Sequence, residues 1–134
     1  MYHSLILIGN LGKDPEMRYT GTGQPVTTFS VATNRRYTGA NGQPVQETAW
    51  FRVTVWAKQA ETCNEFLHKG SKVLVEGRLN PDPETGGPRL WDNNGKPGAS
   101  YEVTASVVRF LSGRDDHEED QPAAVLATEG DIPF

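Results

Sequence analysis

The sequence lacks the residue patterns on which most enzyme and metal sites depend. It has one cysteine, Cys63, so neither an intrachain disulfide nor a cluster of thiolate ligands can form. Its three histidines are scattered along the chain, and none stands at a zinc-ligand spacing. No Ser or Asp forms a motif with a base, and no Gly-x-Gly-x-x-Gly follows a predicted strand. We therefore expect no catalysis, metal or cofactor, and we expect Cys63 to be a small packed residue.

Long apolar runs and a basic leader are also missing. The apolar run Leu5–Ile8 is too short for a signal peptide and has no basic residue before it. No stretch approaches the length needed to span a membrane. A soluble, cytoplasmic protein is expected. With 134 residues, one domain is the natural expectation, and 14 Gly and 9 Pro indicate many turns between short strands.

Positive charge is absent from the C-terminal segment. All 13 Lys and Arg residues lie in 1–114 together with 10 of the 17 acidic residues, which gives this part a net charge of +3. The remaining 7 acidic residues give 115–134 a net charge of −7. This asymmetry indicates a polyanionic partner for the body. The alternative is an acidic, solubilising tail on an ordinary domain.

The segment Thr48–Lys58 is the most informative part of the chain. It is rich in β-branched and aromatic residues, which predicts a strand with alternating faces. One face carries apolar side chains suited to a core: Phe51, Val53, Val55 and Ala57. The other carries Trp50, Arg52, Thr54 and Trp56, a combination on which bases can stack while phosphates are neutralised. The alternative is that both Trp residues are buried at a domain or subunit contact.

The rest of the chain predicts an all-β fold. Strands are expected at Tyr2–Leu11, Val26–Arg35, Lys72–Leu79 and Tyr101–Leu111, besides Val45–Lys58. A helix is expected at Gln59–Lys69, with Gly70 as its cap. Three strands, one helix and two strands predict a five-stranded OB-fold barrel with one short helix between strands 3 and 4. Further inward residues are expected to be Ala60, Cys63, Phe66, Leu67, Val73, Val75, Leu79, Val103, Ala105, Val107 and Leu111.

Two connections are expected to carry more cations and aromatic rings. Asn41-Gly42 predicts a hairpin between the second and third strands, with Arg35, Arg36 and Tyr37 on its arm. Asn80–Ser100 is expected to be a long loop with two turns, and it holds Arg89 and Trp91. Residues 112–134 have no sustained periodicity and are expected to be disordered.

Several motifs together resemble bacterial single-stranded DNA-binding proteins. They are Ile8–Glu16 with Arg18-Tyr19, then Thr48–Val53, Lys69–Val73 with Glu76-Gly77, and Asp131–Phe134 at the end of the sequence. The resemblance divides the chain into a DNA-binding OB domain, 1–111, and an acidic tail, 112–134. It implies a nucleoid-associated homotetramer that binds and protects single-stranded DNA in replication, recombination and repair.

The resemblance also implies roles for individual residues. Bases would stack on Tyr37, Trp50, Trp56 and Trp91. Replication and repair proteins would be recruited by the tip, which consists of Asp131, Ile132, Pro133 and Phe134. The cations near the aromatic residues are our candidates for phosphate binding: Arg35, Arg36, Arg52, Lys58, Lys69 and Arg89.

Two other functions agree with the residues themselves. An adaptor could use the Trp face to bind a protein, and an RNA chaperone of the cold-shock type could use it to bind RNA. The cations between and beside the aromatic rings favour a nucleic acid over a protein.

Overall fold

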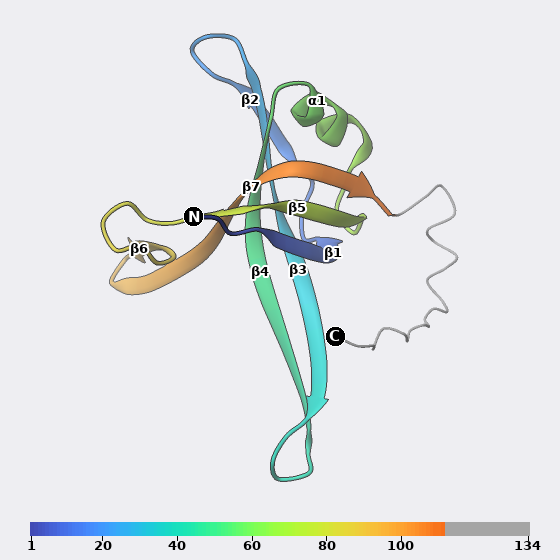
Figure 1. Cartoon of the computed structure of the whole chain (residues 1–134), viewed down its shortest axis with the longest axis vertical. Helices are drawn as coiled ribbons and strands as arrows, with labels where there is room; N and C mark the ends of the chain where they lie inside the picture. The colour runs from blue at the N-terminus through green and yellow to red at the C-terminus, as the bar shows by residue number, and fades with distance from the viewer. Residues whose placement is uncertain (112–134) are drawn as a thin grey trace.

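The computed structural model describes residues 1–111, which form seven strands and one helix. The expected order of three barrel strands, one helix and two barrel strands is confirmed, with the short strands β2 and β6 as additions (Figure 1). In chain order, the elements are β1 (Leu5–Leu11), β2 (Glu16–Tyr19), β3 (Pro25–Thr38), β4 (Pro44–Trp56), α1 (Ala57–Phe66), β5 (Lys72–Asn80), β6 (Arg89–Asn93) and β7 (Lys96–Phe110).

Five of the strands close into a barrel. They pair in the order β1, β5, β7, β4, β3, and β1 then pairs with β3 through Asn10↔Ala32 and Leu11↔Val31. The β4–β7 pair is parallel and the others are antiparallel. A side chain at Gly9 would collide with the carbonyl group of Ala32, so the closing strands can approach only because this residue is glycine. The barrel with α1 between β4 and β5 confirms the predicted OB-fold.

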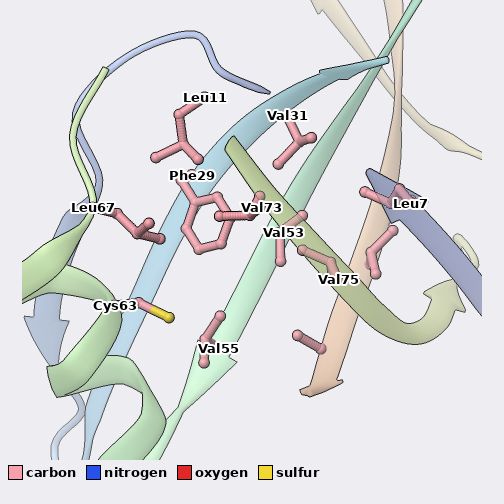
Figure 2. Packing of buried hydrophobic residues seen from close by; sticks show 12 residues of the cluster. Leu7, Leu11, Phe29, Val31, Val53, Val55, Cys63, Leu67, Val73 and Val75 are labelled. Carbon is pink, nitrogen blue, oxygen red and sulfur yellow. The ribbon is translucent and has the colours of Figure 1, made fainter. Parts of the chain in front are cut away.

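The interior of the barrel is filled mainly by valine. Val53 and Val55 of β4 are fully buried, as predicted, because alternation points them away from Trp50 and Trp56. Cys63 and Leu67 reach into the same cluster from the segment that carries α1, as Figure 2 shows. Burying a valine, leucine or phenylalanine side chain in this way stabilises the fold by roughly 1.5–3 kcal/mol. The cluster also contains Leu7, Leu11, Phe29, Val31, Val73, Val75, Val103 and Ala105.

The hairpin of β3 and β4 extends well beyond the barrel (Figure 1). The two strands stay in register from Val26↔Trp56 to Thr38↔Pro44. At the tip, the Gly39 amide donates to the carbonyl of Gln43 at 2.8 Å, and Gly42 has a φ of +80°. The hairpin predicted from Asn41-Gly42 is therefore confirmed, and it forms an arm with little core behind it.

The segment 80–100 is more regular than expected. The two turns predicted there are present, the first closed by hydrogen bonds between Asp82 and the Gly86–Gly87 pair. The second turn holds Asn94 and Gly95, both with positive φ, which suits a tight hairpin. It joins β6 to β7, which begins at Lys96 and not at the predicted Tyr101. The prediction of a loop was therefore wrong for 89–100.

A β-bulge corrects the predicted core face of β7. Val103 and Ala105 point inward, but the register then shifts so that Gly77 pairs with Ala105 and Glu76 with Val107. The extra residue reverses the alternation, so Val108 packs against the core. Val107 is therefore only half-buried and Leu111 is exposed, and their predicted inward positions were wrong.

Three other predicted core positions were also wrong. Leu79 is exposed because the barrel covers the inward face of β5 only as far as Gly77, two residues before it. Phe66 is exposed and contacts the ring of Phe110 at a centroid distance of 6.2 Å. Ala57 is exposed because the strand ends at Trp56 and the helix begins one residue later.

The helix α1 is shorter than the predicted Gln59–Lys69. It ends at Phe66, and Leu67 is its C-cap residue with extended dihedral angles. Gly70 has a φ of +91°, but it lies in the turn closed by the Ser71 amide on the carbonyl of His68 rather than at the helix end. Within residues 1–111, no helix has the length and apolar character needed to cross a membrane.

Candidate nucleic-acid interface

The outer face of the β3–β4 hairpin presents the predicted row of aromatic and polar residues. The side chains of Trp50 and Trp56 are 52% and 43% exposed, while Val53 and Val55 between them are fully buried on the other face. Small side chains lie directly opposite on β3, with Ala32 facing Trp50. The rings are therefore accessible from solvent, and the alternative that they are buried within this chain is excluded.

The indole ring of Trp50 is supported by Gly12, the residue that follows β1. A Cβ atom built at Gly12 would lie 2.6 Å from Cζ3 and 2.8 Å from Cη2 of Trp50, closer than real Cβ contacts. The Gly12 amide donates to the carbonyl of Ser30 at 3.1 Å, which fixes this glycine against β3. The absence of a side chain at Gly12 thus lets the six-membered ring of the indole lie against the backbone.

Trp91 has a similar support in the β6–β7 hairpin. It is paired with Gly98 across the hairpin, and a Cβ atom at Gly98 would collide with the indole. Trp91 nevertheless remains 46% exposed. The hairpin projects from the barrel (Figure 1). An aromatic ring over a cross-strand glycine is a fixed platform rather than a free side chain.

Two of the predicted phosphate-binding arginines share one carboxylate. Arg52 donates from Nη1 to Oε1 of Glu102 at 3.2 Å, and Nη1 of Arg89 lies 3.9 Å from Oε2 of the same carboxylate. Ser100 also donates to this Oε2 at 2.7 Å. The Glu102 side chain is only 12% exposed. The carboxylate therefore holds Arg52 through a hydrogen bond and offsets part of the charge of both arginines.

The arm places its predicted residues on two faces. Arg35 pairs with Glu47 at 3.0 Å, and its guanidinium carbon lies 4.5 Å from the centroid of the Tyr37 ring. By strand alternation, these two residues continue the inward face of the barrel, whereas Arg36 continues the face of Trp50. Tyr37 and Trp50 therefore lie on opposite faces of the hairpin. Both faces are exposed to solvent in this part of the arm.

The remaining candidates lie at the two ends of the helix region. Lys58 is exposed in the first turn of α1, two residues after Trp56. Lys69 follows α1, and its amide donates to Oδ1 of Asp14 at 2.8 Å, close to the segment that holds Gly12. Within residues 1–111, Arg36, Lys58 and Lys69 form no ion pair.

Two exposed residues near these groups were missed by the sequence analysis. Tyr101 is exposed, and its ring centroid lies 5.6 Å from that of Phe51 on the neighbouring strand. Arg78 lies on β5 and points away from the core beside Thr104. Alternation around the buried Val75 and Gly77 was the available signal for Arg78, but placing it two strands from β4, across β7, required the strand order. The predicted tip, Asp131–Phe134, lies outside the described residues.

A comparison with protein families gives one match that covers most of the chain. The model described as "Single-strand binding protein family" matches residues 2–111. The chain belongs to this family. The sequence resemblance to bacterial single-stranded DNA-binding proteins is thereby confirmed.

Relatives with known names agree with this assignment. A single-stranded DNA-binding protein of Neisseria meningitidis is 36% identical over 120 residues, which are 90% of this chain and 66% of that protein. Single-stranded DNA-binding protein 2 of Listeria monocytogenes is 38% identical over 119 residues, covering 89% of this chain and 69% of that protein. The chain therefore spans about two thirds of the length of these relatives.

Two solved structures are similar to the described fold. The single-stranded DNA-binding protein of Plasmodium falciparum in complex with single-stranded DNA has a TM-score of 0.68 and 28% identity, over 83% of this chain and 96% of that one. A deletion mutant of the single-stranded DNA binding protein from Thermus aquaticus has a TM-score of 0.65 and 31% identity, over 84% of this chain and 51% of that one.

Proposed function

We propose that this protein binds single-stranded DNA with little sequence preference and protects it in replication, recombination and repair. The observation that carries the proposal is the outer row of β4, where Trp50 and Trp56 are exposed on either side of Arg52. Family membership and the similarity to a structure solved with single-stranded DNA support it. Every base has a flat face, so stacking on these rings tolerates any sequence.

The mechanism combines stacking with neutralisation of charge. Bases stack on Tyr37, Trp50, Trp56 and Trp91, and phosphates are bound by the exposed cations among Arg35, Arg36, Arg52, Lys58, Lys69 and Arg89. None of these steps breaks or forms a covalent bond, so the function we propose is binding rather than catalysis. Within residues 1–111, no group of three or more His, Cys, Asp and Glu side chains could hold a metal ion.

Competition between nucleic acids tests this function directly. Labelled oligo-dT should be displaced by unlabelled oligo-dT and much less by duplex DNA of equal length. Trp emission should be quenched on binding, and Trp50→Ala and Trp56→Ala should each weaken binding by roughly 1–3 kcal/mol. Val55→Ala is the control, since it should lower the free energy of unfolding more than either Trp change. Equal competition by duplex DNA, or stronger competition by RNA, would contradict the proposal.

We also propose that the protein assembles as a homotetramer through β1. Ile6 and Ile8 are 62% and 47% exposed on the outside of this strand, where a single small barrel leaves them in water. A second copy of the chain would cover them. Light scattering should give four times the chain mass, and Ile8→Glu should lower this mass while Ile8→Leu should not.

The C-terminal tip is proposed to recruit replication and repair proteins. The proposal is supported by the resemblance of Asp131–Phe134 to the family's tip and by the charge of −7 in 115–134. Apolar Ile132 and Phe134 would enter a pocket on a partner with a basic rim. Deleting Asp131–Phe134 should abolish capture of these partners and leave the affinity for oligo-dT equal or slightly higher. Loss of DNA binding with partners still bound would contradict this division of roles.

A further inference from the structure

The outer face that carries Trp50 and Trp56 continues across β7 to β5. Cross-strand pairs place Thr28, Thr54, Thr104 and Arg78 in one row over β3, β4, β7 and β5. On β5, Gly77 is buried and Arg78 is exposed, so Arg78 points away from the core. This row is adjacent to the row that contains Arg52, and it lies further along β4, toward Trp56.

The charge of Arg78 differs from that of the arginines in the adjoining row. Arg52 and Arg89 both pair with Glu102, so part of their charge is already offset. Within the part of the chain that the structure describes, Arg78 forms no ion pair. The threonines of its own row contribute no negative charge. Of these three arginines, Arg78 therefore has the charge most available to an anion.

We propose that Arg78 binds the phosphate backbone of single-stranded DNA and that the binding face extends from β3–β4 to β5. This inference rests on the proposed function. Neighbouring strands lie about 4.8 Å apart, so β5 is roughly 10 Å from β4 across β7. An OB fold contacts about 4–16 nucleotides, which is enough to cover this width. The planar guanidinium group of Arg78 suits a phosphate, which it can bind through two hydrogen bonds.

Arg109 provides a matched control on the same pair of strands. It is an exposed arginine of β7 that lies opposite Leu74 of β5, and it forms no ion pair within residues 1–111. Leu74 and Arg78 are separated by four residues of β5, or roughly 13 Å along the strand. Arg78→Gln and Arg109→Gln remove the same charge, but only the first removes it from the row of Thr54 and Thr104.

The test is a titration of the full chain with oligo-dT over a range of salt concentrations. Each phosphate contact on a single strand contributes about 0.7 to the slope of log K against log[salt]. Arg78→Gln should lower this slope by about that amount and weaken binding several-fold at low salt. Arg109→Gln should change neither quantity, and Arg78→Lys should restore most of the slope because the charge returns.

The outcomes separate this inference from the proposed function. If Arg78→Gln behaves like Arg109→Gln while the unchanged protein binds oligo-dT, Arg78 is not a phosphate contact and the proposed function stands. If both variants lose equal slope, the effect is one of net charge and the inference is likewise wrong. If the unchanged protein does not bind oligo-dT, both proposals fail.

Discussion

Arg52 of β4 and Glu102 of β7 lie side by side in the parallel strand pair, and Nη1 of Arg52 donates to Oε1 of Glu102 at 3.2 Å. The arginine lies between the two exposed Trp residues, where a bound strand would place its phosphates. If Arg52 binds phosphate as proposed, the carboxylate competes with the phosphates for the same guanidinium group. In the proposed mode of binding, the pair would therefore limit how strongly Arg52 contributes.

We expect Glu102→Gln to bind oligo-dT more tightly and with a steeper salt dependence. The change keeps the shape of the side chain and an oxygen that can accept from Ser100, but it removes the charge that offsets Arg52 and Arg89. One or two released cations would raise the slope of log K against log[salt] by about 0.7 to 1.4. Fluorescence titrations at several salt concentrations measure both effects.

The control for this change is Glu47→Gln in the arm. It releases only Arg35, whose pair with Glu47 lies on the other face of the hairpin from Trp50. We expect a smaller effect there. Weaker binding by Glu102→Gln would mean that the carboxylate is needed to orient Arg52, and that its competition with phosphate is the lesser effect.

Gly12→Ala should disturb binding more than folding. The new methyl group would meet the far end of the Trp50 ring, which is half exposed and can turn away at little cost in stability. The ring would then leave the position in which it lies against the backbone, so stacking should weaken. Gly21→Ala is the control, because nothing lies within 4 Å of a Cβ atom at that position.

Two measurements decide this prediction. Affinity for oligo-dT should fall for Gly12→Ala by less than the roughly 1–3 kcal/mol expected for complete loss of one stack, and it should be unchanged for Gly21→Ala. The melting temperature of Gly12→Ala should stay close to that of the unchanged protein. A large fall in melting temperature with unchanged affinity would show that Gly12 serves the barrel rather than the ring.

Much of this interface could be predicted because strand alternation is a local property. The exposed Trp50 and Trp56 and the buried Val53 and Val55 follow from their order in one segment. The hairpin turn followed in the same way from Asn41-Gly42. These features depend on neighbours in sequence, and the structure agrees with each of them.

Other features depend on contacts between distant segments. The bulge that turns Val108 inward in place of Val107 requires the pairing of β7 with β5, with Gln59 of α1 accepting from the Val108 amide at 2.9 Å. The shared carboxylate of Glu102 requires β4 and β7 to be neighbours, although their residues are 50 apart in sequence. Arg78 likewise lies on the same outer face as Trp50 and Trp56 only because β5 pairs with β7. No local pattern specifies these pairings.

Cys63 should make stability depend on pH in the alkaline range. Burial raises the pKa of its thiol from 9.0 to about 11, because the charged thiolate is disfavoured inside the barrel. In the unfolded chain the thiol ionises nearer 9.0, so the folded state binds the proton more tightly. The protonated thiol's contribution to the free energy of unfolding is complete below pH 9.0 and is lost as the pH rises toward about 11.

Urea unfolding at pH 8 and pH 10.5 measures this contribution. The loss of stability between the two pH values should be smaller for Cys63→Ala, although that variant is less stable at both. Iodoacetamide should label the native thiol far more slowly than the thiol of the unfolded protein, because the thiolate is the reactive form. Rapid labelling of the native protein at pH 8 would contradict the burial of Cys63.

Ala57→Gly should stabilise the protein. Ala57 lies at the junction of β4 and α1 with a φ of +62°, a region that is costly for a residue with a Cβ atom. Glycine adopts it freely, although its greater freedom in the unfolded chain offsets part of the gain. We expect a net gain of about 1 kcal/mol or less, and a melting temperature a few degrees higher at fixed protein concentration. Ala40→Gly is the control, since Ala40 has no positive φ and should gain nothing.

The junction also sets the direction of Trp56 and Lys58 on either side of it, so the affinity for oligo-dT measures whether the strained backbone serves binding. Equal affinity with higher stability would mean that the strain has no role in binding, whereas weaker binding by a more stable protein would mean that Ala57 holds Trp56 in its stacking position.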